Sequence, residues 1–131
     1  MKYLLDSNAV IDMLRGNEKV LSKYESETKK KNKILICPIV YYEVTRGFRI
    51  LNATKKIEMF WNFYSDWENL PLTDEVMDKS SEIYESLHKG QQIEDNDIFI
   101  AAVAVVNNCT LITANDKHFV RIDGLKVENW R

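Results

Sequence analysis

An uninterrupted apolar stretch at residues 98–106, Ile-Phe-Ile-Ala-Ala-Val-Ala-Val-Val, restricts the fold of this chain more than any other segment. A helix that is apolar on every side is stable in water only when it is buried. The alanines and the length of the stretch favour a helix over a strand. Asp95 and Asp97 stand directly before it, at the expected first turn. The sequence therefore predicts a helix enclosed by the rest of the protein.

Short apolar strands alternate with helices along the rest of the chain. The expected strands are residues 2–5, 34–37, 70–72, 110–113 and 125–127. Helices are expected near residues 7–16, 17–30, 38–51, 54–68, 73–90 and, as a single turn, 116–119. Strands separated by helices predict an α/β fold in which a parallel sheet is covered on both faces.

The composition is that of one soluble domain spanning residues 1–131, with 45% hydrophobic and 29% charged residues. The N-terminus does not resemble a signal peptide, and no stretch approaches the ~20 apolar residues of a membrane span. We therefore expect a cytoplasmic protein without membrane contact. Cys37 and Cys109 are expected to be buried, reduced thiols.

The charge and the motifs argue against several functional classes. The net charge is −2, whereas a general nucleic-acid binder is usually basic, so attraction to any nucleic acid would need local patches and a bound cation. No Walker A motif, GxGxxG loop, nucleophile elbow or Cys/His zinc cluster occurs. His88 and His118 are isolated and expected at the surface.

Polar side chains gather where predicted strands end and predicted helices begin. In a parallel α/β sheet, ligands bind beyond the carboxyl ends of the strands. The candidates at this edge are Asp6, Glu43, Asp95, Asp97, Asn115 and Asp116.

Glu43 is the most informative of these residues because it stands between apolar positions of its helix. A carboxylate near a core is costly unless something pairs with it. Several converging carboxylates would repel one another and their pKa values would rise, and a divalent cation reverses that effect. Oxygen-only ligands suit Mg²⁺ or Mn²⁺ better than zinc.

Each candidate also has a purely structural interpretation. Asp6, with Ser7 and Asn8, could cap the first helix. Asp95 and Asp97 could cap the apolar helix, and Asn115 with Asp116 could form an ordinary turn. Glu43 could pair with an arginine of its own helix, Arg46 or Arg49. These alternatives stay open from the residues alone.

Four segments, in order, resemble the motifs of the PIN-domain ribonucleases, and within them the VapC-type toxins of toxin–antitoxin pairs. The segments are 3–8 with Asp6, 39–47 with Glu43, 93–102 with Asp97, and 111–119. In the last segment the family's Asp or Asn after the threonine falls on Asn115, with Asp116 adjacent, so either could serve the fourth position.

The resemblance implies a PIN-like three-layer sandwich with a central parallel sheet of about four to five strands flanked by helices. It also implies Mg²⁺ or Mn²⁺ dependence, cleavage of single-stranded RNA by a metal-activated water, homodimerisation, and inhibition by a cognate antitoxin. The aromatic residues of segment 38–68 are expected to serve as core, antitoxin groove or dimer face.

The resemblance assigns roles to individual residues. Asp6, Glu43, Asp97 and Asp95 are the expected catalytic residues. Asp6 and Asp97 would bind the metal directly, and Glu43, Asp95 and Asp116 are further metal candidates. Ser7 and Asn115 would orient ligands or water, and Arg46 would contact an RNA phosphate.

Three other functions remain compatible with the sequence. One is a housekeeping RNA-processing PIN nuclease, and another is a PIN domain that binds RNA or protein without catalysis. A third is an acidic α/β phosphatase or receiver domain. The phosphatase pattern needs a second Asp two residues after Asp6, where this chain has Asn8.

Overall fold

The structure, a computed structural model, describes residues 1–87 and 93–131. Helices and strands alternate along these ranges, as the apolar pattern predicts. In chain order they are β1 (Lys2–Leu5), α1 (Ser7–Leu14), α2 (Glu18–Lys29), β2 (Lys33–Ile36), α3 (Pro38–Ile50), α4 (Thr54–Tyr64), β3 (Glu68–Asn69), α5 (Asp74–Ser86), α6 (Asp95–Val106), β4 (Thr110–Ile112), α7 (Asp116–Phe119) and β5 (Lys126–Glu128).

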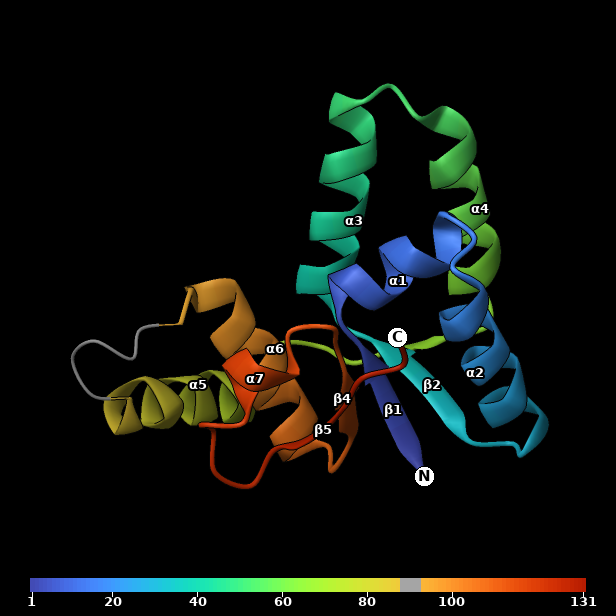
Figure 1. The fold of residues 1–131 in the computed structure, drawn as a ribbon. Coiled ribbons are helices and arrows are strands. Elements are labelled where there is room, and N and C mark those ends of the chain that lie inside the picture. Colours follow the sequence, from blue (N-terminus) through green and yellow to red (C-terminus); the bar gives the residue numbers. More distant parts are fainter. Residues whose placement is uncertain (88–92) are drawn as a thin grey trace.

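The strands form one parallel sheet in the order β3-β2-β1-β4-β5. The central strand is β1, in which Leu4 pairs with Leu35 of β2 and Leu5 pairs with Ile112 of β4. Because all neighbours are parallel, the carboxyl ends of β1, β2 and β4 meet at one edge of the sheet, the upper edge in Figure 1. This edge is where the candidate site residues were expected to meet.

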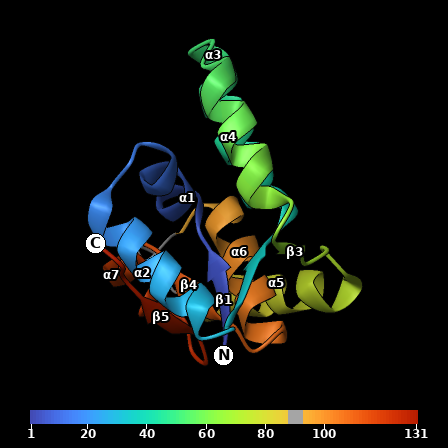
Figure 2. The same ribbon diagram turned by 90° about the vertical axis from the view of Figure 1, so that its right-hand side faces the viewer.

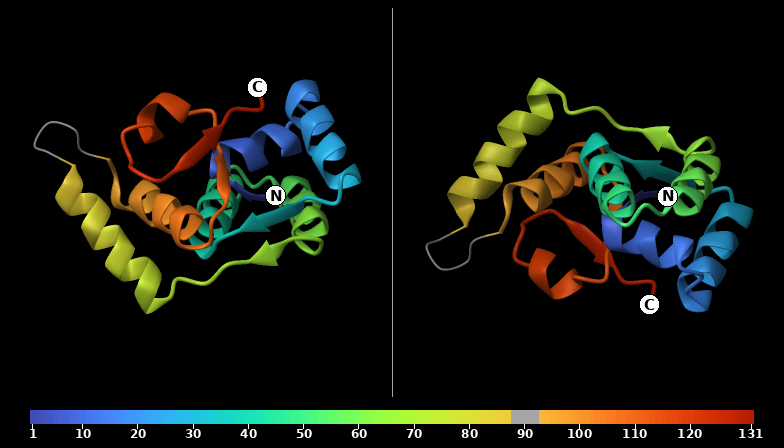
Figure 3. Two further views of the ribbon diagram at one scale, coloured as in Figure 1. Left: turned by 90° about the horizontal axis from the view of Figure 1, so that it is seen from below. Right: turned by 90° about the horizontal axis from the view of Figure 1, so that it is seen from above.

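Helices cover both faces of the sheet. α5 and α6 lie on one side of it, and α1 and α2 lie on the other, as the two views of Figure 3 show. α3 and α4 pack against each other as a hairpin that projects beyond the carboxyl edge of the strands (Figures 1 and 2). The predicted three-layer α/β sandwich is confirmed.

The apolar stretch forms α6, which is buried as expected. Ile98, Ile100 and residues 101–104 all lie in the core. The helix packs against α5, α3 and β4, and its alanines allow close approach of the neighbouring backbone. No helix in the described ranges, α6 included, is both long enough and apolar enough to cross a membrane. Cys37 and Cys109 are buried and unpaired, as predicted.

The third strand lies earlier than predicted. β3 occupies residues 68–69 rather than 70–72. The Leu70 N–H donates a last bond to the Ile36 carbonyl at 2.8 Å. β2 ends at Ile36 and α3 begins at Pro38, so the chain beyond Leu70 has no strand left to pair with.

The sequence predicts that α4 ends at residue 68 and α5 near residue 90. α4 ends at Tyr64, four residues before the predicted end, so that the chain can turn Trp67 into the core. Trp67 is 8% exposed, and its indole N–H donates to the Tyr24 hydroxyl at 2.9 Å. α5 ends at Ser86, and its predicted end near Gly90 lies outside the described residues.

The burial of α6 gives a test of the core. Val103→Ala removes two methyl groups from a fully buried position and should cost about 2 kcal/mol of unfolding free energy. Val105→Ala, two residues along the same helix at a partly exposed position, should cost less than about 0.5 kcal/mol. Urea unfolding measures both, and equal losses would contradict this orientation of α6.

Candidate active site

Three elements carry carboxylates to the carboxyl edge of the sheet. Asp6 follows β1, Glu43 lies in the second turn of α3, and Asp97 lies in the first turn of α6. The charge of Glu43 raises the pKa of Asp6, and the charges of Asp6 and Glu43 raise the pKa of Asp97. The three groups are thus close enough to repel one another, and we call them the acidic centre.

Asp6 is the most deeply buried member of the acidic centre, with 2% exposure. Its Oδ1 accepts a bond from the Ser7 N–H at 2.8 Å, so it does cap α1. Its Oδ2 accepts from the Thr113 hydroxyl at 2.8 Å and from the Asn8 amide at 3.2 Å. Burial is the main cause that raises the pKa of Asp6, and these three bonds work against it.

The Asp6 carboxylate is held by a network that joins two strand ends. Thr113 follows β4, and its hydroxyl oxygen also accepts from the Asn8 amide at 3.2 Å and from the Asn115 N–H at 3.0 Å. The side-chain oxygen of Asn8, Oδ1, accepts a bond from the Ala114 N–H at 2.9 Å. Asp6 is therefore a helix cap and also the fixed centre of a polar network, which a cap alone does not require.

Glu43 carries an oxygen without a partner. Its side chain is 16% exposed, and Oε1 is buried with no hydrogen bond from the described residues. Oε2 faces the guanidinium of Arg46 at 3.8 Å and the Asn96 amide at 3.5 Å. Burying a carboxylate oxygen without a hydrogen-bond donor is costly. A cation or a donor group bound next to Oε1 of Glu43 would therefore stabilise it.

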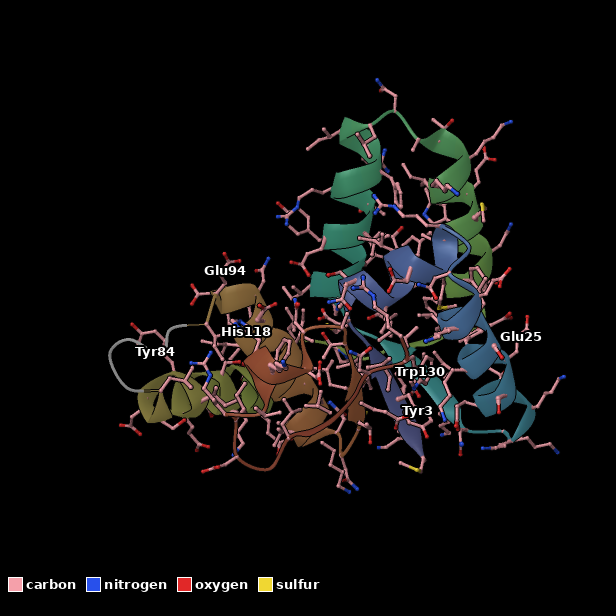
Figure 4. All side chains as sticks on the ribbon, viewed as in Figure 1. Tyr3, Glu25, Tyr84, Glu94, His118 and Trp130 are labelled. Carbon is pink, nitrogen blue, oxygen red and sulfur yellow. The ribbon has the colours of Figure 1, made fainter. Side chains whose placement is uncertain are left out.

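Asp97 has its pKa raised to about 6. Burial is the largest cause, followed by the negative charge of Asp6, with smaller contributions from Glu43 and Glu94. His118 acts in the opposite direction, because its Nε2 lies 3.4 Å from Oδ2 of Asp97. Figure 4 shows Glu94 and His118 on the same side of the molecule, near the amino end of α6.

The acidic centre has the chemistry of a site for a hard cation. It offers only carboxylate oxygens, one of them unpartnered within the described residues, and the pKa values of Asp6 and Asp97 are raised. Within residues 1–87 and 93–131, no three Asp, Glu, His or Cys side chains already converge as closely as a coordination shell requires. The carboxylates instead turn partly toward Thr113, Arg46 and His118.

The other candidates lie outside the acidic centre. Asp95 is exposed and lines a 210 Å³ cavity between α5 and α6. Oδ1 of Asp116 accepts from the Asn129 amide at 3.3 Å. The Asn115 side chain is exposed, and this residue reaches the network through its backbone N–H. The roles expected for these three residues stay predictions.

Sequence reasoning overlooked several polar neighbours of the acidic centre. His118 was expected at the surface, yet it contacts Asp97, while His88 lies outside the described residues. Thr113 and Asn96 were not singled out either. Of these residues, only Thr113 could have been found from the sequence. It ends the predicted strand 110–113 and directly follows β4 of the structure, just as Asp6 directly follows β1.

Comparisons with known proteins identify the family. The PIN domain matches residues 3–125, so the chain belongs to the PIN domain family. Among its relatives is ribonuclease VapC2 of Rickettsia felis, which is 31% identical over 99% of this chain and 98% of its own length.

Solved structures agree with this assignment. The VapBC2 complex of Rickettsia felis bound to a promoter DNA fragment contains a chain with a TM-score of 0.87 and 29% identity, and all of both chains is covered. The VapBC-1 structure from nontypeable Haemophilus influenzae gives a TM-score of 0.85 at 27% identity, over 99% of this chain and 98% of that chain. The fold around the acidic centre is therefore that of known PIN-domain proteins.

The raised pKa of Asp97, caused first by burial and then by the charge of Asp6, predicts how stability depends on pH. A folded-state pKa of about 6 against an ordinary 3.8 means that the folded chain binds this proton more tightly. The stabilisation is complete below pH 3.8 and is lost as the pH rises through 6. Asp97→Asn should remove that loss and, in EDTA at pH 7, raise the unfolding free energy.

The expected gain in unfolding free energy from Asp97→Asn is about 1 kcal/mol. This is less than the free energy equivalent of the whole pKa shift, because a quarter of the side chain is exposed to solvent. The measurement is urea unfolding between pH 4 and pH 7. Asp95→Asn, an exposed carboxylate in the same helical turn, should follow the wild-type profile. A wild-type profile in Asp97→Asn would contradict the raised pKa of Asp97 in the folded state.

Proposed function

We propose that this chain is an endoribonuclease, dependent on Mg²⁺ or Mn²⁺, that cleaves single-stranded RNA as the toxin of a type II toxin–antitoxin pair. The observation that carries the proposal is the acidic centre, in which a buried Glu43 oxygen has no partner among the described residues and stands beside two carboxylates of raised pKa. Its support is membership of the PIN domain family and relatives that are named ribonucleases.

The residues present fit a divalent cation. Asp6 and Asp97 would hold it directly, and Glu43 would hold it through water or in a second position. When bound, such a cation activates water and stabilises charge on phosphate oxygens. Thr113 and Asn8 keep the Asp6 carboxylate fixed by their donated hydrogen bonds, which spares the site a reorganisation cost.

Residues around the acidic centre take supporting roles in this proposal. Arg46, whose side chain is half exposed, would contact an RNA phosphate. Ser7 orients Asp6 through its N–H, and Asn115 supports Thr113 in the same way. Asp95 and Asp116 would take part only if RNA or metal drew them inward.

An antitoxin partner is part of the same proposal. Structures similar to this chain are VapBC complexes, which supports a protein inhibitor. Much of the aromatic segment is core, since Phe48, Phe60 and Trp67 are buried, whereas Trp61 is 45% exposed and available to a partner. A homodimer and a cytoplasmic location stay predictions.

Loss of a carboxylate should abolish cleavage. Asp6→Asn and Asp97→Asn should each lower Mn²⁺-dependent cleavage of single-stranded RNA at least about a hundredfold, since each removes charge and a ligand from the centre. Gel analysis of end-labelled RNA measures this loss. The control Asp78→Asn on α5 should cleave at the wild-type rate. Full activity in Asp6→Asn or Asp97→Asn would contradict the assignment of these two residues to the catalytic site.

Metal binding should be visible without catalysis. Mn²⁺ binds the folded state and should raise the melting temperature of the wild-type chain as its concentration increases. Glu43→Gln and Asp97→Asn should show a clearly smaller rise, while Asp78→Asn, at an exposed carboxylate on α5, should respond like the wild type. An equal rise in all four proteins would place the ion elsewhere.

A further inference from the structure

A solvent-exposed tyrosine stands beside the acidic centre. Tyr42 precedes Glu43 in α3, and 54% of it is exposed. The guanidinium carbon of Arg46 lies 4.9 Å from the centroid of the Tyr42 ring. The two residues are four positions apart, so they are neighbours on one helix face, and the cation–π contact orients the ring.

Arg46 connects this ring to the acidic centre. Its Nη2 lies 3.8 Å from Oε2 of Glu43, and the negative charge of Glu94 also attracts it. At 100° per residue, position 46 lies between positions 42 and 43 around the helix. The ring, the guanidinium and the carboxylate therefore form one continuous surface along α3.

The fold does not depend on the Tyr42 ring. The preceding residue, Tyr41, has the structural role, because its ring packs against Phe60 and Tyr64 at 5.2 and 5.0 Å between centroids. Its hydroxyl accepts a bond from the Trp61 indole at 3.0 Å. No such aromatic packing involves Tyr42 within the described residues, so one face of its ring can receive a ligand.

We infer that Tyr42 and Arg46 form a stacking platform for one unpaired RNA base next to the scissile phosphate. Single-stranded RNA is recognised largely by bases that stack on aromatic rings and on guanidinium planes. The net charge of −2 makes general backbone attraction weak, so a local platform would supply binding that the whole surface does not. The inference rests on the proposed ribonuclease function.

The test compares steady-state cleavage of a short single-stranded RNA, after its cleavage site has been mapped with the wild-type protein and Mn²⁺. Tyr42→Ala should raise KM about tenfold and leave kcat within about twofold, because stacking holds substrate and transition state alike. Tyr42→Phe keeps the ring and should restore the wild-type KM. Tyr84→Ala, at another exposed tyrosine on α5 (Figure 4), should behave as wild type.

Abasic substitutions in the RNA identify the stacked base. One position next to the cleaved bond should raise the wild-type KM about tenfold when its base is removed. The same removal should have no further effect on Tyr42→Ala, because the two changes delete one contact. Additive effects, or a wild-type KM in Tyr42→Ala, would overturn the platform and leave the ribonuclease proposal intact. A wild-type protein that cleaves no RNA would overturn both.

Discussion

The burial of Asp6 at the junction of β1 and α1 is the constraint on which the rest of the site depends. A carboxylate with 2% exposure needs donors, and they come from Ser7, Asn8 and Thr113. Because Thr113 directly follows β4, the same bonds fix the strand beside β1 and define the sheet edge. The site therefore exists only where the central strands are correctly paired.

Glu43 and Asp97 add a second constraint, which is charge. Each comes from a helix that begins near this edge of the sheet. The charge of Glu43 raises the pKa of both Asp6 and Asp97, and the charge of Asp6 raises the pKa of Asp97. Arg46 and His118 offset part of the repulsion, but one Glu43 oxygen has no partner in residues 1–87 and 93–131. Such a centre costs stability by itself and gains it from a cation, which is the trade-off expected of a functional site.

Much of the fold, and the position of Asp6 in it, was predictable from the local sequence pattern. The alternation of strands and helices gave the parallel sheet, and strand ends placed Asp6 correctly at its edge. The pattern did not separate Asp95 from Asp97, which lie about 200° apart around a helix. Since α6 is apolar all round, it has no polar face to show which carboxylate turns inward, and packing against α3 and α5 decides that.

The contacts of His118 and Asn96 were beyond prediction, because they join elements whose relative position only the tertiary structure defines. The central claim is that Asp6, Glu43 and Asp97 form one cation site. Anomalous diffraction at the manganese edge, from crystals grown with Mn²⁺, tests it most directly. We predict a peak within coordination distance of Asp6 and Asp97 and close to Glu43. Manganese peaks confined to Asp95, Asp116 or other surface carboxylates would contradict the claim.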